Sequence, residues 1–246
     1  MRTANPALST KTFERFDSFA DDTHMTLMGT VHKSGLLLLI LVVPAIWVWG
    51  QVTRMGGQAA LMWMGIGLIG GLVVALITVF KQTWAPITAP IYAALEGLAL
   101  GGISALVELR FPGIVIQAVT LTFGIFFCLL LAYRSGMIKA TENFKLGVVA
   151  ATGGIFMIYM ASWILSFFGT SIPFIHESGL IGILFSLGVV VVASLNLVLD
   201  FDFIEQGAEH GAPKYMEWYA AFGLLVTLVW LYIEILHLLM KLQSRD

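Results

Sequence analysis

Long apolar stretches separated by short polar segments constrain this chain more than any other feature of its sequence. A helix needs about 20 apolar residues to cross the hydrocarbon core of a bilayer, and after Lys33 the intervals between charged residues provide this length repeatedly. Only 11% of the residues are charged, whereas soluble domains carry about 25%. Most of the protein's surface is therefore expected to face lipid.

The sequence predicts an all-α, polytopic membrane protein with a seven-transmembrane-helix bundle. A polar N-terminal tail, residues 1–33, precedes a single transmembrane domain, residues 34–246. The sixth span either ends at Asp200 or continues to a turn at Gly211–Pro213. The expected spans are residues 34–53, 55–80, 84–107, 111–133, 146–168, a stretch that begins near 179 and one from 216 to 240.

The distribution of basic residues predicts the orientation, because cytoplasmic loops of membrane proteins are enriched in Lys and Arg. Of the 13 basic residues, the tail and the loops after the second, fourth and sixth spans hold most. We therefore expect the N-terminus in the cytoplasm and the C-terminus outside. The compact form of the chain, without recognisable sorting signals, favours a bacterial inner membrane. The net charge of −2 predicts no nucleic-acid partner, since such proteins present a basic face.

Two pairs of glycines are spaced for close contact between helices. Gly67 and Gly71 form one small-xxx-small pattern, and Gly97 and Gly101 form another. Such patterns let helix backbones approach one another in a membrane. We expect them to serve packing rather than a hinge.

The stretch from Val189 to Glu205 carries acidic side chains within apolar sequence and no basic residue. A carboxylate at membrane depth costs roughly 3 kcal/mol on insertion scales, so its first interpretation is functional. Asp200 is the central candidate, and Asn196, four residues earlier, lies on the same helical face. Asp202 points to a different side of the helix.

Glu96 is the first candidate partner for Asp200. It lies about 12 residues, or roughly 18 Å, into the third span from Trp84. If the sixth helix continues to its turn at Gly211, Asp200 lies roughly 16 Å from that turn. The two carboxylates are then expected at one depth. Otherwise, Glu96 is a protonated carboxyl that hydrogen-bonds a neighbouring helix.

The seventh span adds two further carboxylates. Glu217 is expected to face Glu205 at the cytoplasmic mouth. Glu234 is expected about 12 residues, or roughly 18 Å, beyond the level of Asp200. It is either a solvated charge at the outer mouth, with His237 nearby, or the second candidate partner of Asp200.

Paired carboxylates predict a response to pH. Two such groups close together in a low dielectric do not both ionise easily. At acidic pH they share a proton, and at alkaline pH they repel one another. Their ionised oxygens are hard ligands that suit Ca²⁺. The hypothesis is a proton-gated calcium path in which Asp200 and Glu96 contact the permeating ion, without a bound cofactor.

The run Leu197-Val-Leu-Asp-Phe-Asp-Phe-Ile-Glu-Gln-Gly-Ala-Glu-His-Gly211 resembles the Bax inhibitor-one family, also called transmembrane Bax-inhibitor-motif proteins. The resemblance implies a seven-helix protein that leaks Ca²⁺ in a pH-dependent way through a latch of acidic residues on the last two long helices. Asp200 matches the latch aspartate of the sixth helix. An ungapped comparison places the second aspartate near Ala221 or Leu225, whereas one anchored at Leu231-Tyr-Ile-Glu234 points to Glu234.

The resemblance also leaves alternatives to a channel. Bacterial relatives are linked to calcium leak or to modulation of a membrane protease, so a non-conducting regulator of another membrane protein is the runner-up, and a proton-coupled exchanger is a third reading. Lys81 is either a counter-charge for the acids or an anchor at the cytoplasmic face. An enzyme is not expected, because the five histidines lie in the tail, in loops or near a helix end, away from the serines of the spans.

Overall fold

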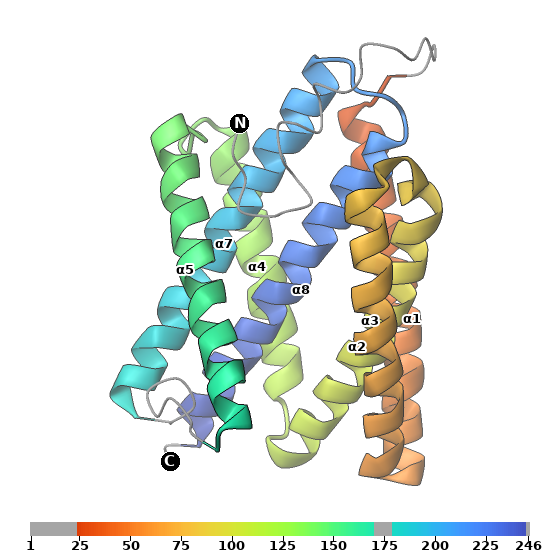
Figure 1. Cartoon of the computed structure of the whole chain (residues 1–246), viewed down its shortest axis with the longest axis vertical. Coiled ribbons are helices and arrows are strands. Elements are labelled where there is room, and N and C mark those ends of the chain that lie inside the picture. The colour runs from red at the N-terminus through yellow and green to blue at the C-terminus, as the bar shows by residue number, and fades with distance from the viewer. Residues whose placement is uncertain (1–23, 170–178, 245–246) are drawn as a thin grey trace. The chain divides into compact units, whose positions relative to one another are not determined.

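The computed structural model describes residues 24–169 and 179–244. Within these ranges the chain forms seven α-helices that are long and apolar enough to cross a membrane (Figure 1). A short 3₁₀ helix, η2 (Gln82–Trp84), joins the second and third helices. The helices are α1 (Leu27–Met55), α2 (Gly57–Phe80), α3 (Ala85–Arg110), α4 (Ile114–Arg134), α5 (Glu142–Phe167), α7 (Leu180–Glu209) and α8 (Met216–Gln243). The predicted all-α architecture with seven spans is confirmed.

Two helices begin earlier than the apolar stretches predict. α1 begins at Leu27 rather than at residue 34, because Thr26 caps it: its hydroxyl oxygen accepts a hydrogen bond from the Gly29 N–H at 3.0 Å. α5 likewise begins at Glu142, where Thr141 caps the helix. Caps set where a helix begins, whereas apolar stretches mark only the part that suits hydrocarbon. Residues 1–23 of the predicted tail lie outside the described residues.

The sixth span does not end at Asp200. α7 continues to Glu209 and stops just before Gly211, which has a φ of 64°. Glycine adopts this left-handed conformation readily and commonly ends helices. The longer of the two predicted forms of this helix is therefore the one the chain adopts.

The chain divides into two compact units, and the division runs through α7 and α8. The α1–α3 unit contains the described residues up to 115 together with 202–226. The α4–α5 unit contains the described residues from 116 to 201 and from 227 onward.

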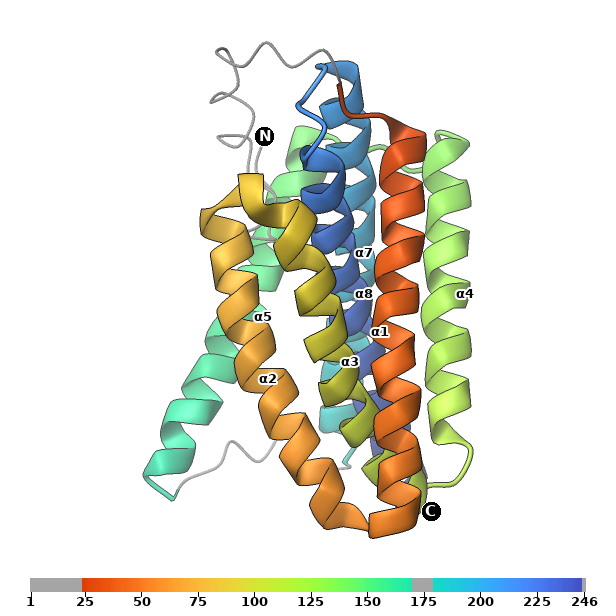
Figure 2. The same ribbon diagram turned by 90° about the vertical axis from the view of Figure 1, so that its right-hand side faces the viewer.

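In the α1–α3 unit, α3 packs along both α1 and α2 (Figure 2). Glycines make the close approach possible. A Cβ on Gly97 would collide with the Leu41 carbonyl of α1, and one on Gly101 would lie 2.5 Å from the Ala45 carbonyl oxygen. On α2, a Cβ at Gly67 would lie 2.5 Å from the backbone of α3. At these three positions the predicted use of small residues for packing is confirmed.

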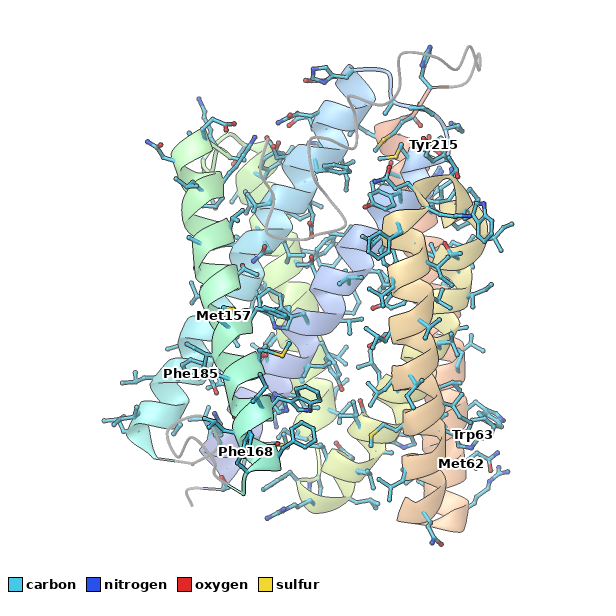
Figure 3. The ribbon with its side chains drawn as sticks, in the orientation of Figure 1. Met62, Trp63, Met157, Phe168, Phe185 and Tyr215 are labelled. Carbon is cyan, nitrogen blue, oxygen red and sulfur yellow. The ribbon has the colours of Figure 1, made fainter. Side chains whose placement is uncertain are left out.

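In the α4–α5 unit, aromatic rings join the helices. Phe201 of α7 contacts Phe126 and Tyr133 of α4, with ring centroids 5.7 and 5.9 Å apart. Phe185, labelled on α7 in Figure 3, contacts the ring of Tyr159 on α5 at 6.2 Å. These rings hold α7 between its neighbours, and α7 carries Asp200.

Candidate functional site

Asp200 lies on α7 with 1% of its surface exposed. Neither of its carboxyl oxygens has a hydrogen-bond partner of regular geometry among the described residues. The Thr227 side chain on α8 lies close enough to interact with the carboxyl. Burying a charge without a partner costs several kcal/mol, so this site strongly disfavours a negative charge in the packed arrangement.

The contacts between α7 and α8 in the α4–α5 unit show one antiparallel register. Asp200 faces Thr227, and Ser186 accepts a hydrogen bond from the Lys241 ammonium at 2.7 Å. Fourteen residues separate the two contacts on each helix. Thr227 is therefore the residue of α8 that lies level with Asp200.

Thr227 stands two residues beyond Leu225, one of the positions at which an ungapped comparison places the second latch aspartate. In this part of the chain the polar group opposite Asp200 is thus a hydroxyl and not a second carboxylate. Sequence reasoning missed Thr227, because a single threonine in an apolar helix gives little signal and the register depends on the length of the α7–α8 connection.

Glu234 is not a solvated charge, so that part of the prediction is wrong. It is 4% exposed, and its carboxylate accepts hydrogen bonds from the Tyr159 hydroxyl of α5 at 3.0 and 3.1 Å. The Trp230 indole N–H donates a third bond at 3.2 Å. His237 Nδ1 lies 3.9 Å away. The carboxylate faces α5, whereas the His237 side chain stays 52% exposed.

The expected separation between Glu234 and the level of Asp200 also needs correction. Glu234 lies seven residues beyond Thr227, or about 10 Å along the helix, rather than roughly 18 Å. The reason is the connection from His210 to Tyr215, which lengthens the turn and moves α8 along α7.

The other two polar residues of α7 differ in environment. Asn196 is 3% exposed, and its amide donates hydrogen bonds of 2.8 Å to the Thr152 hydroxyl of α5 and to the Val192 carbonyl. Asp202 is partly exposed and accepts a hydrogen bond of 2.6 Å from Gln206 in its own helix. Asn196 thus links α7 to α5 in the α4–α5 unit, as Asp200 links α7 to α8.

Glu217 is fully buried at the start of α8, close to Tyr215, which is labelled in Figure 3. Its carboxylate pairs with Lys33 of α1 and, at 2.8 Å, with Lys214. Thr26 donates two hydrogen bonds of 2.9 Å to the same oxygen, from its backbone N–H and its hydroxyl.

Glu217 does not lie at an open mouth, because it is fully buried and enclosed by α1. That it faces the exposed Glu205 stays a prediction. Gly29 leaves room for the carboxylate, since a Cβ there would overlap it. Nearby, the Met25 N–H donates to the Ala212 carbonyl at 2.6 Å. Sequence reasoning missed Lys33 because it assigned that residue to the tail.

Glu96 is partly buried on α3. Its carboxylate accepts a hydrogen bond from Tyr92 one turn earlier and faces Gly71 of α2. The expected partner on a neighbouring helix is therefore replaced by one on the same helix. Glu96 and Asp200 belong to different units, so their pairing stays a prediction.

Lys81 is exposed at the end of α2, with its ammonium 4.5 Å from the centroid of the Trp84 ring. A basic residue beside an exposed tryptophan is typical of an anchor at a membrane interface. Among the described residues, Lys81 forms no ion pair with a carboxylate, and no three His, Cys, Asp or Glu side chains are grouped to hold a metal ion.

Seven apolar helices, with buried carboxyl groups on the last two, define a multi-pass membrane protein. Within this class the chain belongs to the Bax inhibitor 1 like family, whose sequence model matches residues 5–244. Searches of curated proteins and of solved structures gave no match. The resemblance carried by residues 197–211 is thereby confirmed at the level of the family.

Proposed function

We propose that this protein is a pH-sensitive calcium leak channel of a bacterial inner membrane, with its N-terminus in the cytoplasm, and that Asp200 is its pH-sensitive group. The observation that carries the proposal is the burial of Asp200 without an ion pair. When protonated, this carboxyl is neutral and suits its apolar surroundings. When ionised, it is a charge that the described residues of its unit do not compensate.

The free-energy cost of ionising the buried Asp200 gives the channel its response to pH. An uncompensated buried carboxylate destabilises the packed arrangement by several kcal/mol, and this cost falls if α7 and α8 separate so that water or a cation reaches Asp200. Carboxylate oxygens are preferred ligands of Ca²⁺. Deprotonation therefore opens the path and supplies a ligand for the permeating ion. Glu96 remains the candidate for a second ligand.

The residue opposite Asp200 determines the expected shape of the pH curve. A latch of two carboxylates titrates as a coupled pair, whereas a carboxyl that faces the Thr227 hydroxyl titrates as one site. We therefore expect the calcium flux to follow a single-proton curve. A curve with two coupled steps would instead indicate a second carboxylate, with Glu96 as the first candidate.

The test is Ca²⁺ uptake into liposomes that contain the purified protein, measured from mildly acidic to mildly alkaline pH. Asp200→Asn should abolish the pH dependence, and Thr227→Val should displace the curve along the pH axis. Glu142→Gln is the matched control, because the Glu142 side chain is 77% exposed. A pH response that survives in Asp200→Asn would exclude Asp200 as the sensor. Flux no greater than in empty liposomes would reject the channel and favour a non-conducting regulator of another membrane protein.

A further inference from the structure

A strip of polar side chains runs through the α4–α5 unit between the C-terminal end of α8 and Asp200. Lys241 of α8 begins it, donating hydrogen bonds to Ser186 of α7 and, at 3.2 Å, to the Gly182 carbonyl. Glu234, with its hydrogen bonds from Tyr159, comes next. Asn196 with Thr152, and finally Asp200 with Thr227, complete the strip.

The spacing of these residues places them on common faces. Thr227, Glu234 and Lys241 follow one another at intervals of seven residues on α8, and seven residues are close to two helical turns. Thr152 and Tyr159 have the same interval on α5. The strip is about 21 Å long on α8 at 1.5 Å per residue.

The two ends of the strip differ in their access to the surface. At one end, the His237 side chain is 52% exposed and lies 3.9 Å from the Glu234 carboxylate. In the other direction along α8, the nine residues from 218 to 226 contain no Asp, Glu, Lys, Arg or His. On α7, Asp202 lies in this same direction and accepts a hydrogen bond from Gln206 of its own helix, and Glu205 beyond it is exposed. Within the α4–α5 unit, the hydrogen-bonded polar side chains of the strip lie on the side of Asp200 that leads to the C-terminal end of α8.

We propose that Glu234 is a proton-relay residue that connects Asp200 to the membrane face at which α8 ends. The inference rests on the proposed role of Asp200 as the pH-sensitive group and adds the side of the membrane whose pH it senses. The titratable groups that face Glu234 are Tyr159 from α5 and His237 and Lys241 from α8. Asp200 faces Thr227, which does not titrate.

Each proton transfer leaves the relay in its starting state. The Glu234 carboxylate takes up a proton at the surface, from water or from protonated His237, and becomes neutral. It then releases this proton toward Asn196, and the Asp200 carboxylate accepts it. Loss of the proton from Asp200 follows the same route in reverse. Successive groups are one to two helical turns apart on α8 and α7, so each transfer requires a short chain of water molecules between them.

The relay is tested without measuring calcium. The protein is placed in liposomes in one orientation, verified by protease removal of a C-terminal tag, and the pH on each face is set separately. Protonation of Asp200 is followed by its carboxyl band in infrared difference spectra, assigned as the band that disappears in Asp200→Asn. In the wild type we expect the band to follow the pH on the face where α8 ends.

In Glu234→Gln the band should respond to that face roughly a hundredfold more slowly, which is the lower end of what a positioned proton-transfer group contributes. Glu142→Gln should respond like the wild type. If Glu234→Gln does not fold, Tyr159→Phe, which removes only a hydroxyl, should slow the response in the same direction. A band that follows the opposite face, or an unchanged rate in the folded relay variants, would overturn the relay.

The two proposals fail in different ways. Absence of calcium flux together with a one-sided infrared response would reject the channel and keep the relay. Calcium flux that depends on Asp200, together with an equal infrared response to both faces, would reject the relay and keep the channel.

Discussion

Glu217 and Asp200 are buried to the same degree but have opposite electrostatic environments. Glu217 is fully buried and surrounded by donors: Lys33, Lys214 and two groups of Thr26. Asp200 is 1% exposed, and among the described residues the interacting polar group is the Thr227 side chain. Burial alone therefore does not identify a functional carboxylate. What distinguishes the two is whether the surroundings compensate a negative charge, and on this ground we interpret Glu217 as a structural residue and keep Asp200 as the functional candidate.

The largest effect should come from removing the charge of Glu217. Glu217→Gln leaves Lys33 without its counter-charge, and breaking a buried ion pair typically costs 3–5 kcal/mol. We expect a loss of about 3 kcal/mol, at the low end, because the Lys33 and Lys214 side chains are 19% and 44% exposed and can reach solvent. Unfolding of the detergent-solubilised protein by urea, followed by tryptophan fluorescence, measures this loss.

The pair of Glu142 with Lys145, at 3.4 Å, provides the control for that measurement, because the Glu142 side chain is 77% exposed although Lys145 is buried. Glu142→Gln should change the free energy of unfolding by no more than about 1 kcal/mol, because the carboxylate that it replaces is exposed to solvent, which weakens its attraction for Lys145. Equal losses in the two variants would mean that the Glu217 cluster does not secure α1 to the start of α8.

The next largest effect concerns the close packing of the unit that contains Glu217. Gly67→Ala forces α2 and α3 apart, and overpacking of this kind costs about 1–3 kcal/mol. Gly65, two residues earlier on the same helix, has nothing within 4 Å of an added Cβ. Gly65→Ala should therefore be neutral or gain up to about 1 kcal/mol from helix propensity. Thermal unfolding of both variants in the same detergent compares them directly, and equal midpoints would refute close contact at Gly67.

Asp200→Asn should have a smaller effect on stability than either of these changes. No ion pair is lost and the volume is kept, so we expect the free energy of unfolding to change by less than about 1 kcal/mol. This result would separate Asp200 from Glu217, since the same kind of substitution disrupts one site and leaves the other folded. A loss as large as that of Glu217→Gln would show that Asp200 has a charged partner and would end the contrast between the two sites.

The smallest effect is expected at Lys81. Its ammonium contacts the Trp84 ring, and an exposed contact of this type contributes about 0.5–1 kcal/mol. Lys81→Met should lower stability by no more than this and leave the calcium flux and its pH dependence unchanged in liposomes. A displaced pH curve would instead support the role of counter-charge for a buried carboxylate.

The seven helices, the family and Asp200 as a candidate residue are readable in the sequence. Apolar length is a local property, so each span is visible without its neighbours. An acidic residue in such a span is equally visible, because nothing in the surrounding residues offsets its cost. The resemblance at residues 197–211 depends on a short continuous run. The end of α7 near Gly211 was one of two predicted possibilities, and local backbone conformation decided it.

The partners of the carboxylates depend on tertiary structure, because they come from residues far apart in the chain. Glu217 meets Lys33 only because Thr26 starts α1 early enough for the helix to reach α8. Glu234 turns toward Tyr159, 75 residues away, rather than toward solvent. The register that sets Asp200 opposite Thr227 follows from the length of the α7–α8 connection, and a shift of a few residues along a helix moves a partner by several ångströms. The sequence by itself thus determines which residues carry charge into the membrane, and only the folded arrangement decides which of those charges is compensated.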